Sequence, residues 1–443
     1  MSFPRYPKYK ASRVEWLGDV PEHWAGTKLK HLGQAQIGLT YDPADIVDES
    51  EGTLVLRSSN VQQGRIVFDD NVFVHTTIPS RLVTQLGDIL ICSRNGSRAL
   101  IGKNAMIGPD AAGLTFGAFM TVFRSGLNGF LFWVFNSQIF ELQSASFLTS
   151  TINQLTIGNL NSFEVLLPPP DEQTKIATFL DRETSKIDGL VGEQRRLIEL
   201  LKEKRQAVIS HAVTKGLNPH APLKPSGIEW LGDVPQHWDF GPLKRFWDVV
   251  DCKHVTVPFF DDGYPVASVM EVREFELDLS QVLRTSEEYF QLLTGGDRQP
   301  QRGDVIYCRN TANTGTSAYV GTDEPIAIGQ DVVLIKSRRK NGRFLNYILH
   351  SGTMAAQLET LMVGSTFKRI NVAEIRMLSV TCPLKDEQDE IVKFLDAETA
   401  KLDALTAEAE HGIELLQERR NALISAAVTG QIDVRGLVET EAA

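Results

Sequence analysis

Cysteine is scarce in this sequence: its 443 residues include four, Cys92, Cys252, Cys308 and Cys382, and none of them stands in a CxxC spacing. This scatter argues against a zinc site and against a disulfide framework, so we expect four reduced thiols packed in the interior. Long hydrophobic runs are also missing. No segment approaches the roughly 20 apolar residues of a membrane span, and the N-terminus lacks the apolar stretch of a signal peptide. We therefore expect a cytoplasmic protein with no membrane partner.

Three catalytic signatures are absent as well. The nearest approach to a GxxxxGK[ST] phosphate loop runs from Gly96 to Asn104, but its spacing is wrong and asparagine stands at the serine or threonine position. There is no Asn-Pro-Pro-Tyr or Asp-Pro-Pro-Tyr tetrapeptide of the amino-methyltransferases, and no acidic nuclease triad with a lysine. The sequence therefore predicts a protein that is not an enzyme, with no catalytic residue and no metal or cofactor of its own.

The net charge of −11 is unfavourable for binding nucleic acid, but it is unevenly distributed. From Asp386 to the C-terminus, 14 acidic and 5 basic residues give −9, which leaves only −2 for the rest of the chain. Basic loops in that larger part can therefore meet phosphate groups. The length and the average composition, with 42% hydrophobic and 23% charged residues, indicate a folded protein of two or more domains.

The sequence contains an internal repeat. Residues 12–24 match residues 226–238 at 10 of 13 positions, and residues 171–214 match residues 386–429 at 25 of 44 positions. Between these segments the similarity nearly disappears, which suits one scaffold that holds two different readers. We predict an N-terminal variable domain (1–170), a first long helix (171–215), a C-terminal variable domain (216–385), a second long helix (386–430) and a tail (431–443).

Both predicted long helices carry apolar residues at seven-residue spacing. Asp171, after three prolines, is the expected cap of the first helix. A second apolar series, three positions after the first, completes a predicted two-stripe coiled-coil seam. The seam residues are Leu180, Ile187, Leu190, Leu197, Leu201 and Val208 in the first helix and Leu395, Leu402, Leu405, Leu416 and Leu423 in the second. Each helix would span on the order of 65 Å. The alternative is that each helix packs only on its own domain, but two matching seams of this length favour an antiparallel pair.

Each variable domain mixes short β-rich runs with glycine- and asparagine-rich turns and a helix, which predicts a mixed α/β (α+β) fold. The loops at 93–98 and 309–315, each after a repeated strand, gather residues that can read DNA: arginine binds guanine, asparagine binds adenine, and glycine admits a phosphate. The same residues also form ordinary turns, so a simple surface turn stays open for each loop. The candidate DNA-binding residues are Arg57, Ser58, Asn60, Arg94, Asn95, Gly96, Arg98, Asn153, Arg309, Asn310, Asn313, Thr314, Lys368 and Arg369.

Two further features have a plainer interpretation. The basic run at 337–343 is interpreted as a solvated turn, because charge runs usually are. The pairs His23-Trp24 and His237-Trp238 are interpreted as packing residues, because no other metal-type ligand recurs near them.

The repeated frame of the sequence resembles a known family. It consists of Glu-Trp-Leu-Gly-Asp-Val-Pro-x-His-Trp, of a domain end reading Leu-Pro-Pro-Pro-x-x-Glu-Gln, and of Ile-x-x-Phe-Leu-Asp-x-Glu-Thr-x-Lys-x-Asp. In the second copy Cys382-Pro383-Leu384 replaces the triple proline. Over nearly the whole chain, this frame closely resembles the specificity subunit of type I restriction-modification systems.

The resemblance implies two target recognition domains and two antiparallel conserved helices. Each domain would read one half of a bipartite, asymmetric site in double-stranded DNA. The helices would set the gap between the halves and dock two modification (methyltransferase) subunits that methylate adenine. Restriction (translocase/nuclease) subunits would add cleavage. S-adenosylmethionine, ATP and magnesium are then expected on the partner subunits. The alternatives are a methyltransferase or nuclease with a hidden site, and a coiled-coil scaffold without DNA specificity.

Overall fold

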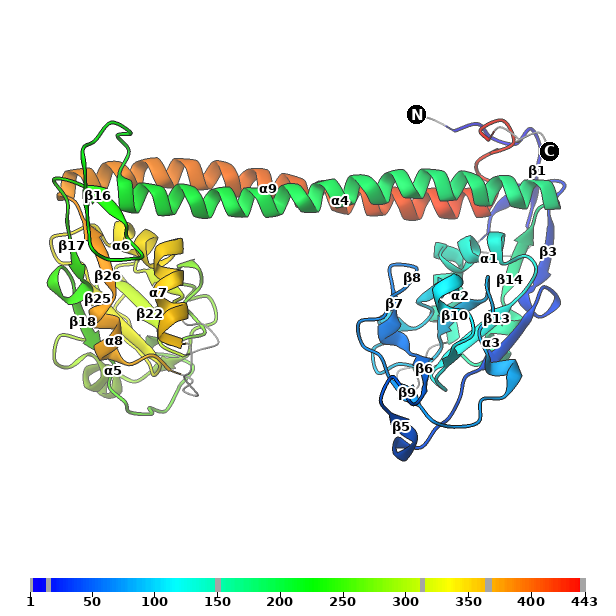
Figure 1. Cartoon of the computed structure of the whole chain (residues 1–443), viewed down its shortest axis with the longest axis horizontal. Coiled ribbons are helices and arrows are strands. Elements are labelled where there is room, and N and C mark those ends of the chain that lie inside the picture. The colour runs from blue at the N-terminus through cyan, green and yellow to red at the C-terminus, as the bar shows by residue number, and fades with distance from the viewer. Residues whose placement is uncertain (1–2, 13–16, 148–152, 311–314, 363–368, 439–443) are drawn as a thin grey trace. The chain divides into compact units, whose positions relative to one another are not determined.

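The computed structural model describes residues 3–12, 17–147, 153–310, 315–362 and 369–438. Contacts divide the chain into unit 1, Met1–Gln194 with His411–Ala443, and unit 2, Arg195–Glu410. Each unit therefore contains one variable domain and one end of each long helix (Figure 1). In the described residues, no helix combines the length and the hydropathy needed to cross a membrane.

Unit 1 is built on two small sheets. One has the order β11 (Asn104–Met106), β10 (Ile89–Cys92), β13 (Met120–Arg124), β4 (Gln34–Ile37). The other has the order β12 (Thr115–Phe116), β6 (Thr53–Leu56), β9 (Phe73–Val74), β5 (Ile46–Val47). Three two-stranded pairs are β1 (Tyr9–Ala11) with β2 (Asp19–Pro21), β3 (Ala25–Lys28) with β14 (Glu164–Leu167), and β7 (Val61–Gln62) with β8 (Arg65–Ile66). The short helices are α1 (Asn128–Phe135), α2 (Gln138–Phe147) and α3 (Ile157–Ser162).

Unit 2 repeats this plan with additions. A five-stranded sheet has the order β18 (Asp248–Asp251), β25 (Val332–Lys336), β22 (Val305–Cys308), β23 (Ser317–Tyr319), β20 (Phe275–Glu276). A second sheet has the order β21 (Arg284–Thr285), β19 (Tyr264–Ala267), β24 (Ala327–Ile328). The two-stranded pairs are β15 (Leu223–Pro225) with β16 (Asp233–Pro235) and β17 (Asp239–Pro242) with β26 (Ser379–Cys382). The short helices are α5 (Glu287–Thr294), α6 (Gly342–Leu349), α7 (Gly352–Met362) and α8 (Val372–Met377).

The two units share one topology although their sequences diverge. The antiparallel pair β10–β13 corresponds to β22–β25, the parallel pair β6–β12 to β19–β24, and the pair β3–β14 to β17–β26. In both, a buried glutamine exchanges two hydrogen bonds with the backbone of the last strand, Gln143 with Glu164 and Gln357 with Ser379, at 2.8 and 3.0 Å. The predicted mixed α/β fold is therefore confirmed for both variable domains.

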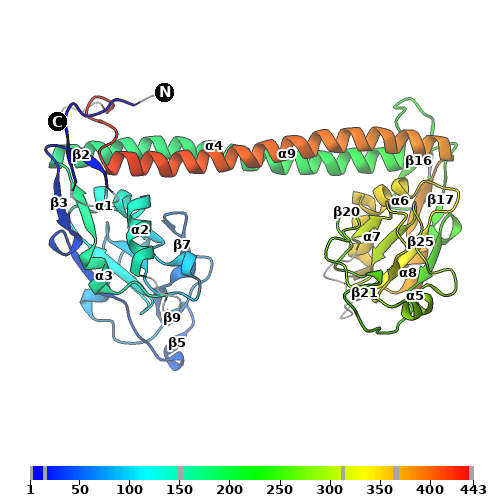
Figure 2. The same cartoon turned by 180° about the vertical axis from the view of Figure 1, so that it is seen from behind.

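The long helices α4 (Pro170–Lys215) and α9 (Lys385–Val428) pack side by side (Figures 1 and 2). In unit 1 the Arg420 Nε lies 2.9 Å from the Asp188 Oδ1, and in unit 2 the Arg205 Nε lies 3.0 Å from the Asp403 Oδ1. These are the same two positions of the repeat with the helices exchanged, and one antiparallel register satisfies both pairs. The predicted antiparallel pair is confirmed. The helix begins at Pro170, so Asp171 lies in its first turn and is not its cap.

The first predicted apolar series forms the seam between the helices. Six of the residues named for it are buried, Leu180, Ile187, Leu201, Leu395, Leu402 and Leu423, while Val208 and Leu416 are partly buried. Ala409, at the same seven-residue spacing, is buried as well. The second predicted series is wrong: Leu190, Leu197 and Leu405 are 53, 44 and 48% exposed. The buried second series stands four positions after the first, where Val191 and Ile198 are found, because that row faces the partner helix at this crossing.

The repeated signature anchors the ends of the long helices. In unit 1, Glu172 accepts hydrogen bonds from the Tyr6 hydroxyl at 3.0 Å and the Trp24 indole at 3.0 Å, and it lies 2.7 Å from the His23 ring. In unit 2, His237 lies 2.9 Å from Glu387. Trp24 and its counterpart in unit 2 are fully buried, so the predicted packing role is confirmed for the tryptophan of each pair, while the histidines are partly exposed and contact a glutamate.

Each unit has its hydrophobic core between the sheet and the helix pair. In unit 1 this core joins Phe130 and Leu131 of α1 to Phe179 of α4 and Ile424 of α9. In Figures 1 and 2, α1 accordingly lies directly beneath the helix pair. The loops that carry the candidate DNA-binding residues are not part of this core.

Candidate nucleic-acid interface

A β-bridge joins the predicted loop at 93–98 to the segment that contains the candidate Asn153. Arg94, just after β10, forms an isolated antiparallel bridge with Gln154. The Leu155 N–H donates to the Ser93 carbonyl at 2.7 Å. The backbone at Arg94 is therefore held in an extended conformation, although the two segments are far apart in the sequence.

Asn95 connects this loop to the segment that contains the candidates Arg57, Ser58 and Asn60. Its Nδ2 donates to the Ser58 Oγ at 3.1 Å, and its Oδ1 accepts the Ser97 N–H at 2.9 Å. The Lys103 Nζ donates to the Ser58 carbonyl at 3.4 Å. The structure thus brings together candidates that the sequence placed in separate loops.

Two more candidates complete this cluster. The Asn153 Nδ2 donates to the Gly96 carbonyl at 3.1 Å, which leaves the Gly96 backbone at an exposed corner. Arg98 is exposed and donates to the Ala145 carbonyl at 3.2 Å. Exposed arginine and glycine backbone are the groups that a phosphate or a base edge can reach.

Arg57 and Asn60 have a different position from the one expected. Asn60 is fully buried: its Oδ1 accepts the Arg57 N–H at 2.9 Å, and its Nδ2 donates to the Val67 carbonyl at 3.0 Å. The Arg57 guanidinium pairs with Asp70 at 2.8 Å. Asn60 thus has no amide edge free for a base, which corrects its prediction as a direct contact, because a buried amide must satisfy its groups inside the protein.

Arg94 is the most available cation of the cluster. Its side chain is exposed, and its guanidinium lies 5.0 Å from the centroid of the Phe119 ring. It forms no ion pair with any residue that the structure describes. Its donors therefore remain free for an acceptor outside the protein.

Arg309, the first candidate of the corresponding loop in unit 2, is buried. It is 8% exposed, its Nη1 lies 2.9 Å from the Asp251 Oδ1, and its Nε donates to the Ile370 carbonyl at 3.2 Å. This geometry corrects the prediction that Arg309 reads a base, because its guanidinium is used inside the protein. Arg309 instead supports the loop that follows it.

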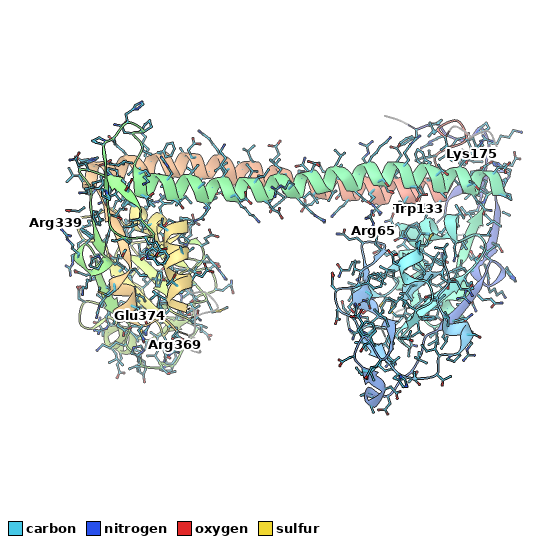
Figure 3. All side chains as sticks on the ribbon, in the orientation of Figure 1. Arg65, Trp133, Lys175, Arg339, Arg369 and Glu374 are labelled. Carbon is cyan, nitrogen blue, oxygen red and sulfur yellow. The ribbon has the colours of Figure 1, made fainter. Side chains whose placement is uncertain are left out.

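Among the candidate residues of unit 2 that the structure describes, Arg369 is an exposed cation, and it lies at the end of the unit remote from the long helices (Figure 3). Its guanidinium forms two contacts with the Asp331 carboxylate, at 2.7 and 2.8 Å. Its backbone forms an isolated antiparallel bridge with Asn310. The candidates Asn313, Thr314 and Lys368 lie outside the described residues.

The loops of the two units occupy the same place on the scaffold. In unit 1 the Phe119 carbonyl accepts the Arg94 N–H at 3.0 Å and also accepts the preceding N–H of the same loop. In unit 2 the Asp331 carbonyl accepts the Arg309 N–H at 2.9 Å. The bridge Arg94–Gln154 likewise corresponds to Asn310–Arg369. One backbone frame therefore presents Arg94, Phe119 and Gln154 in one unit and Asn310, Asp331 and Arg369 in the other.

Sequence reasoning missed part of this surface. Beside the unit 1 loops lies an open concavity of about 620 Å³, lined by Ser58, Ser59, Gln62, Gln63, Leu100 and Lys103. Gln63 has a positive φ of 50°, which turns the tip of the β7–β8 hairpin. The tetrapeptide Val-Gln-Gln-Gly at 61–64 is a hairpin signal that could have indicated this surface.

The thiols near these loops are not activated. All four cysteines are free and buried, as predicted. Burial raises the pKa of Cys92, and it raises the pKa of Cys308 to about 12. Both groups thus stay protonated at neutral pH, and a protonated thiol is a poor nucleophile.

One group of described residues has metal-type donors. Asp251, Cys252 and His254 offer ligand atoms that lie within 4.8 Å of one another. The Arg309 guanidinium already occupies one oxygen of Asp251. It places a positive charge beside the group and disfavours a cation there.

Known proteins share this architecture. The family described as type I restriction modification DNA specificity domain matches residues 75–199 and 271–415. The type I restriction enzyme EcoKI specificity subunit of Escherichia coli K12 is 22% identical over 446 residues, covering 95% of this chain and 92% of that protein. The type I restriction enzyme MjaVIII specificity subunit of Methanocaldococcus jannaschii is 24% identical over 287 residues, covering 62% of this chain but 64% of that protein.

Solved structures share the fold. A structure described as "Structural basis underlying complex assembly and conformational transition of the type I R-M system" matches 92% of this chain and 98% of its own, at a TM-score of 0.70 and 18% identity. The HsdS subunit from Thermoanaerobacter tengcongensis matches 93% of this chain and 98% of its own, at a TM-score of 0.52 and 17% identity.

Two copies of one mixed α/β domain on a pair of antiparallel helices, each with its own loop surface on a shared backbone frame, define a two-module recognition subunit. The chain belongs to the family of type I restriction modification DNA specificity domains, as a specificity subunit of a type I restriction-modification system. Specificity subunits are the non-catalytic components of these systems.

Proposed function

We propose that this chain recognises a bipartite, asymmetric site in double-stranded DNA, with one variable domain reading each half. The observation that carries the proposal is the shared loop frame with different side chains. Arg94 and Phe119 stand in unit 1 where Asn310 and Asp331 stand in unit 2. Arginine favours guanine and asparagine favours adenine, so two different sets of side chains on one frame would select two different half-sites.

The candidate residues divide into contacts and supports. Arg94, Arg98 and the Gly96 backbone are the proposed contacts of unit 1, since they are exposed. Asn310 and Arg369 are the proposed contacts of unit 2. The supports shape the loops through internal hydrogen bonds, and they are Arg57, Ser58, Asn60, Asn95, Asn153 and Arg309.

The helix pair is proposed to set the gap between the half-sites. Its register is defined twice, by Arg420–Asp188 in unit 1 and by Arg205–Asp403 in unit 2. A slip by one turn would break both pairs and misplace the buried leucines of the seam. A fixed register gives a fixed spacing, which a bipartite reader needs.

The helices also offer a surface for two copies of one partner. Unit 1 exposes Leu190 of α4 and Leu415 of α9, and unit 2 exposes Leu405 and Leu200, which are the same repeat positions with the helices exchanged. Single exposed leucines are common on protein surfaces, so the support for a partner contact is that this pair recurs at the same repeat positions in both units. We propose that each pair docks one modification subunit, which brings S-adenosylmethionine and the adenine-methylating site, and that restriction subunits bring ATP and magnesium.

The test is an adenine-methylation map of DNA from cells carrying the modification partner, with and without this gene. A bipartite motif that appears only with the gene is the expected result. No gene-dependent motif, in cells where the chain and its partner co-purify, would contradict the proposal and favour a scaffold without DNA specificity. Methylation or cleavage of DNA by the purified chain alone would instead favour an enzyme with a hidden site.

A further inference from the structure

Phe119 is a large apolar side chain displayed on an otherwise polar loop surface. It is 57% exposed and stands at the corner of the turn between β12 and β13, where the Met120 N–H donates to the Gly117 carbonyl at 2.8 Å. Its neighbours in space are polar residues of the reading loops. A turn in such a place normally carries a small or polar residue, so packing inside the protein does not explain this ring.

The backbone of Phe119 is rigidly held. Its carbonyl accepts three hydrogen bonds of 3.0 Å, from the Ser93 N–H, the Ser93 hydroxyl and the Arg94 N–H. The ring is therefore displayed from a fixed position and loses little conformational freedom when it makes a contact. Rigid aromatic anchors of this kind contribute most of the selectivity in many binding surfaces.

Arg94 and Phe119 act as a pair. The guanidinium lies over the ring, 5.0 Å from its centroid, which is a cation–π distance. Its N–H edge remains available, since no described carboxylate pairs with it. The loop thus presents a planar set of hydrogen-bond donors directly beside an apolar ring.

We propose that this pair reads a step in the major groove where guanine is adjacent to thymine, with Arg94 donating to guanine O6 and N7 and Phe119 covering the thymine 5-methyl group. The inference rests on the proposed function and adds the identity of the bases. The thymine methyl group and the guanine O6 and N7 acceptors both lie in the major groove, and the minor groove exposes none of the three.

The surroundings favour a nucleic acid over a protein partner. Asn95, Ser58 and Lys103 lie in the same cluster, and the adjoining concavity is lined by glutamines and serines. An isolated ring among amides, hydroxyls and cations matches the mixture of acceptors and methyl groups in the groove. A docking site for a protein would present a broader apolar patch.

The first experiment maps adenine methylation in cells that express Phe119→Ala, Phe119→Leu or Arg94→Ala with the modification partner. We expect Phe119→Ala to tolerate any base at one thymine position and Arg94→Ala to tolerate any base at the adjacent guanine. Phe119→Leu, which keeps an apolar contact, should retain most of the preference. The other half-site is an internal control, because its unchanged reading shows that the variant chain is folded and assembled.

The second experiment measures binding of the assembled modification complex to duplexes that carry the mapped target. Replacing the thymine by deoxyuridine removes only the methyl group and should weaken binding by the wild-type chain about fourfold. The same replacement should have no effect on Phe119→Ala. Replacing the guanine by 7-deazaguanine should weaken binding by the wild-type chain about fivefold or more and leave Arg94→Ala unaffected.

The outcomes separate this inference from the function on which it rests. If no gene-dependent motif exists, the proposed function fails. If a bipartite motif exists but neither variant changes its first half, or deoxyuridine weakens wild-type and Phe119→Ala binding equally, the base reading by this pair is refuted while the function stands. Loss of both half-sites together with loss of the modification subunit from Phe119→Ala would make the ring a protein contact and would also refute the inference.

Discussion

The loops that carry the candidate DNA contacts share one backbone frame in the two units, but their arginines differ in whether a carboxylate pairs with them. In unit 1, Arg94 rests on an aromatic ring and keeps its hydrogen-bond donors free. In unit 2, Arg309 is buried against Asp251, and Arg369 is held by both oxygens of Asp331. The duplicated scaffold therefore fixes the positions of the loop residues. Nearby carboxylates decide whether the hydrogen-bond donors of an arginine in the loop are free to contact a ligand. Under the proposed function, the donors of Arg94 can bind DNA directly, whereas Arg369 would have to exchange Asp331 for DNA.

The largest expected effect comes from breaking the frame that both units share. Inserting four helical residues after Glu193 lengthens α4 by about 6 Å and rotates everything beyond it by about 40°. The register that satisfies Arg420–Asp188 cannot then satisfy Arg205–Asp403. We expect methylation of the original target to be lost, or to move to a target with a different gap, in a methylation map. An unchanged target would contradict the role of the helices as a ruler.

Removing the glutamate that contacts the signature at the start of each long helix should destabilise unit 1 more than unit 2. Glu172→Ala leaves the Trp24 indole and the Tyr6 hydroxyl buried without a partner, and we expect it to lower the free energy of unfolding of unit 1 by about 3 kcal/mol. The matched change Glu387→Ala removes only the partly exposed contact with His237, so about 0.5 kcal/mol is expected. Urea unfolding followed by hydrogen exchange in each unit measures both. Equal losses of unfolding free energy from the two variants would contradict this difference between Glu172 and Glu387.

Replacing Arg309 and Arg94 with alanine, one at a time, tests the comparison directly. Arg309→Ala removes the buried partner of Asp251 and leaves it only the exposed His254. Because the carboxylate is partly exposed, we expect a loss of about 2 kcal/mol of stability, together with weaker reading of the second half-site. Arg94→Ala should change stability by less than about 0.5 kcal/mol and relax only the first half-site. Thermal unfolding and a methylation map of each variant give the two readouts. A stability loss from Arg94→Ala as large as that from Arg309→Ala would reject the assignment of contact and support.

Freeing Arg369 should make unit 2 resemble unit 1. Asp331→Asn removes the charge that holds the guanidinium, so binding of duplex DNA should tighten by about threefold to tenfold at low salt and become more salt-dependent. Affinity measured between about 50 and 200 mM salt checks this. Asp323→Asn, which frees the exposed Arg302 in the same unit, is the control for a general gain of positive charge. Equal gains from the two variants would mean that Arg369 has no special access to DNA.

The smallest expected effect concerns pH. Burial lowers the pKa of His350, which follows α6 and stacks on Phe275, and Asn136 stands at the corresponding place after α1. Because the folded-state pKa lies below the unfolded value of 6.5, the unfolded chain binds more protons as pH falls below 6.5, and unit 2 loses stability there. Lowering the pH from about 7.5 to 5.5 should cost up to about 1 kcal/mol in unit 2. In hydrogen exchange, His350→Asn should remove this dependence, and a dependence that persists would assign it to other groups.

The fold was largely predictable because the same signals occur twice. The two signatures and the two matching helix starts indicate a duplicated chain, and apolar spacing indicates long paired helices. The second apolar series was predicted wrongly. In the sequence, apolar residues recur both three and four positions after the first series, so the spacing does not show which of the two series is buried. Only the crossing of two actual helices buries Val191 and Ile198 and leaves Leu190 and Leu197 exposed.

The candidate site was only partly predictable. The sequence named residues 93–98, Ser58 and Asn153 as separate candidates, and only the structure shows that the segments which carry them lie next to each other. Phe119 was not identified, because a lone phenylalanine in a sequence signals burial, and its exposure follows from a turn whose carbonyl is fixed by another loop.

By itself the sequence determined the duplication, the mixed α/β class of each domain, the extent of the long helices and the family, because these depend on local propensity and on repeated motifs. The tertiary structure alone decided which cations can reach a ligand. Arg94 stands where Asn310 stands in unit 2, while Arg309 takes the place of the buried Ser93. Asp251, distant in sequence, pairs with Arg309, and the Phe119 ring lies against Arg94. The availability of a charge depends on the groups that the fold brings within a few ångströms, and no sequence pattern in either loop specifies them.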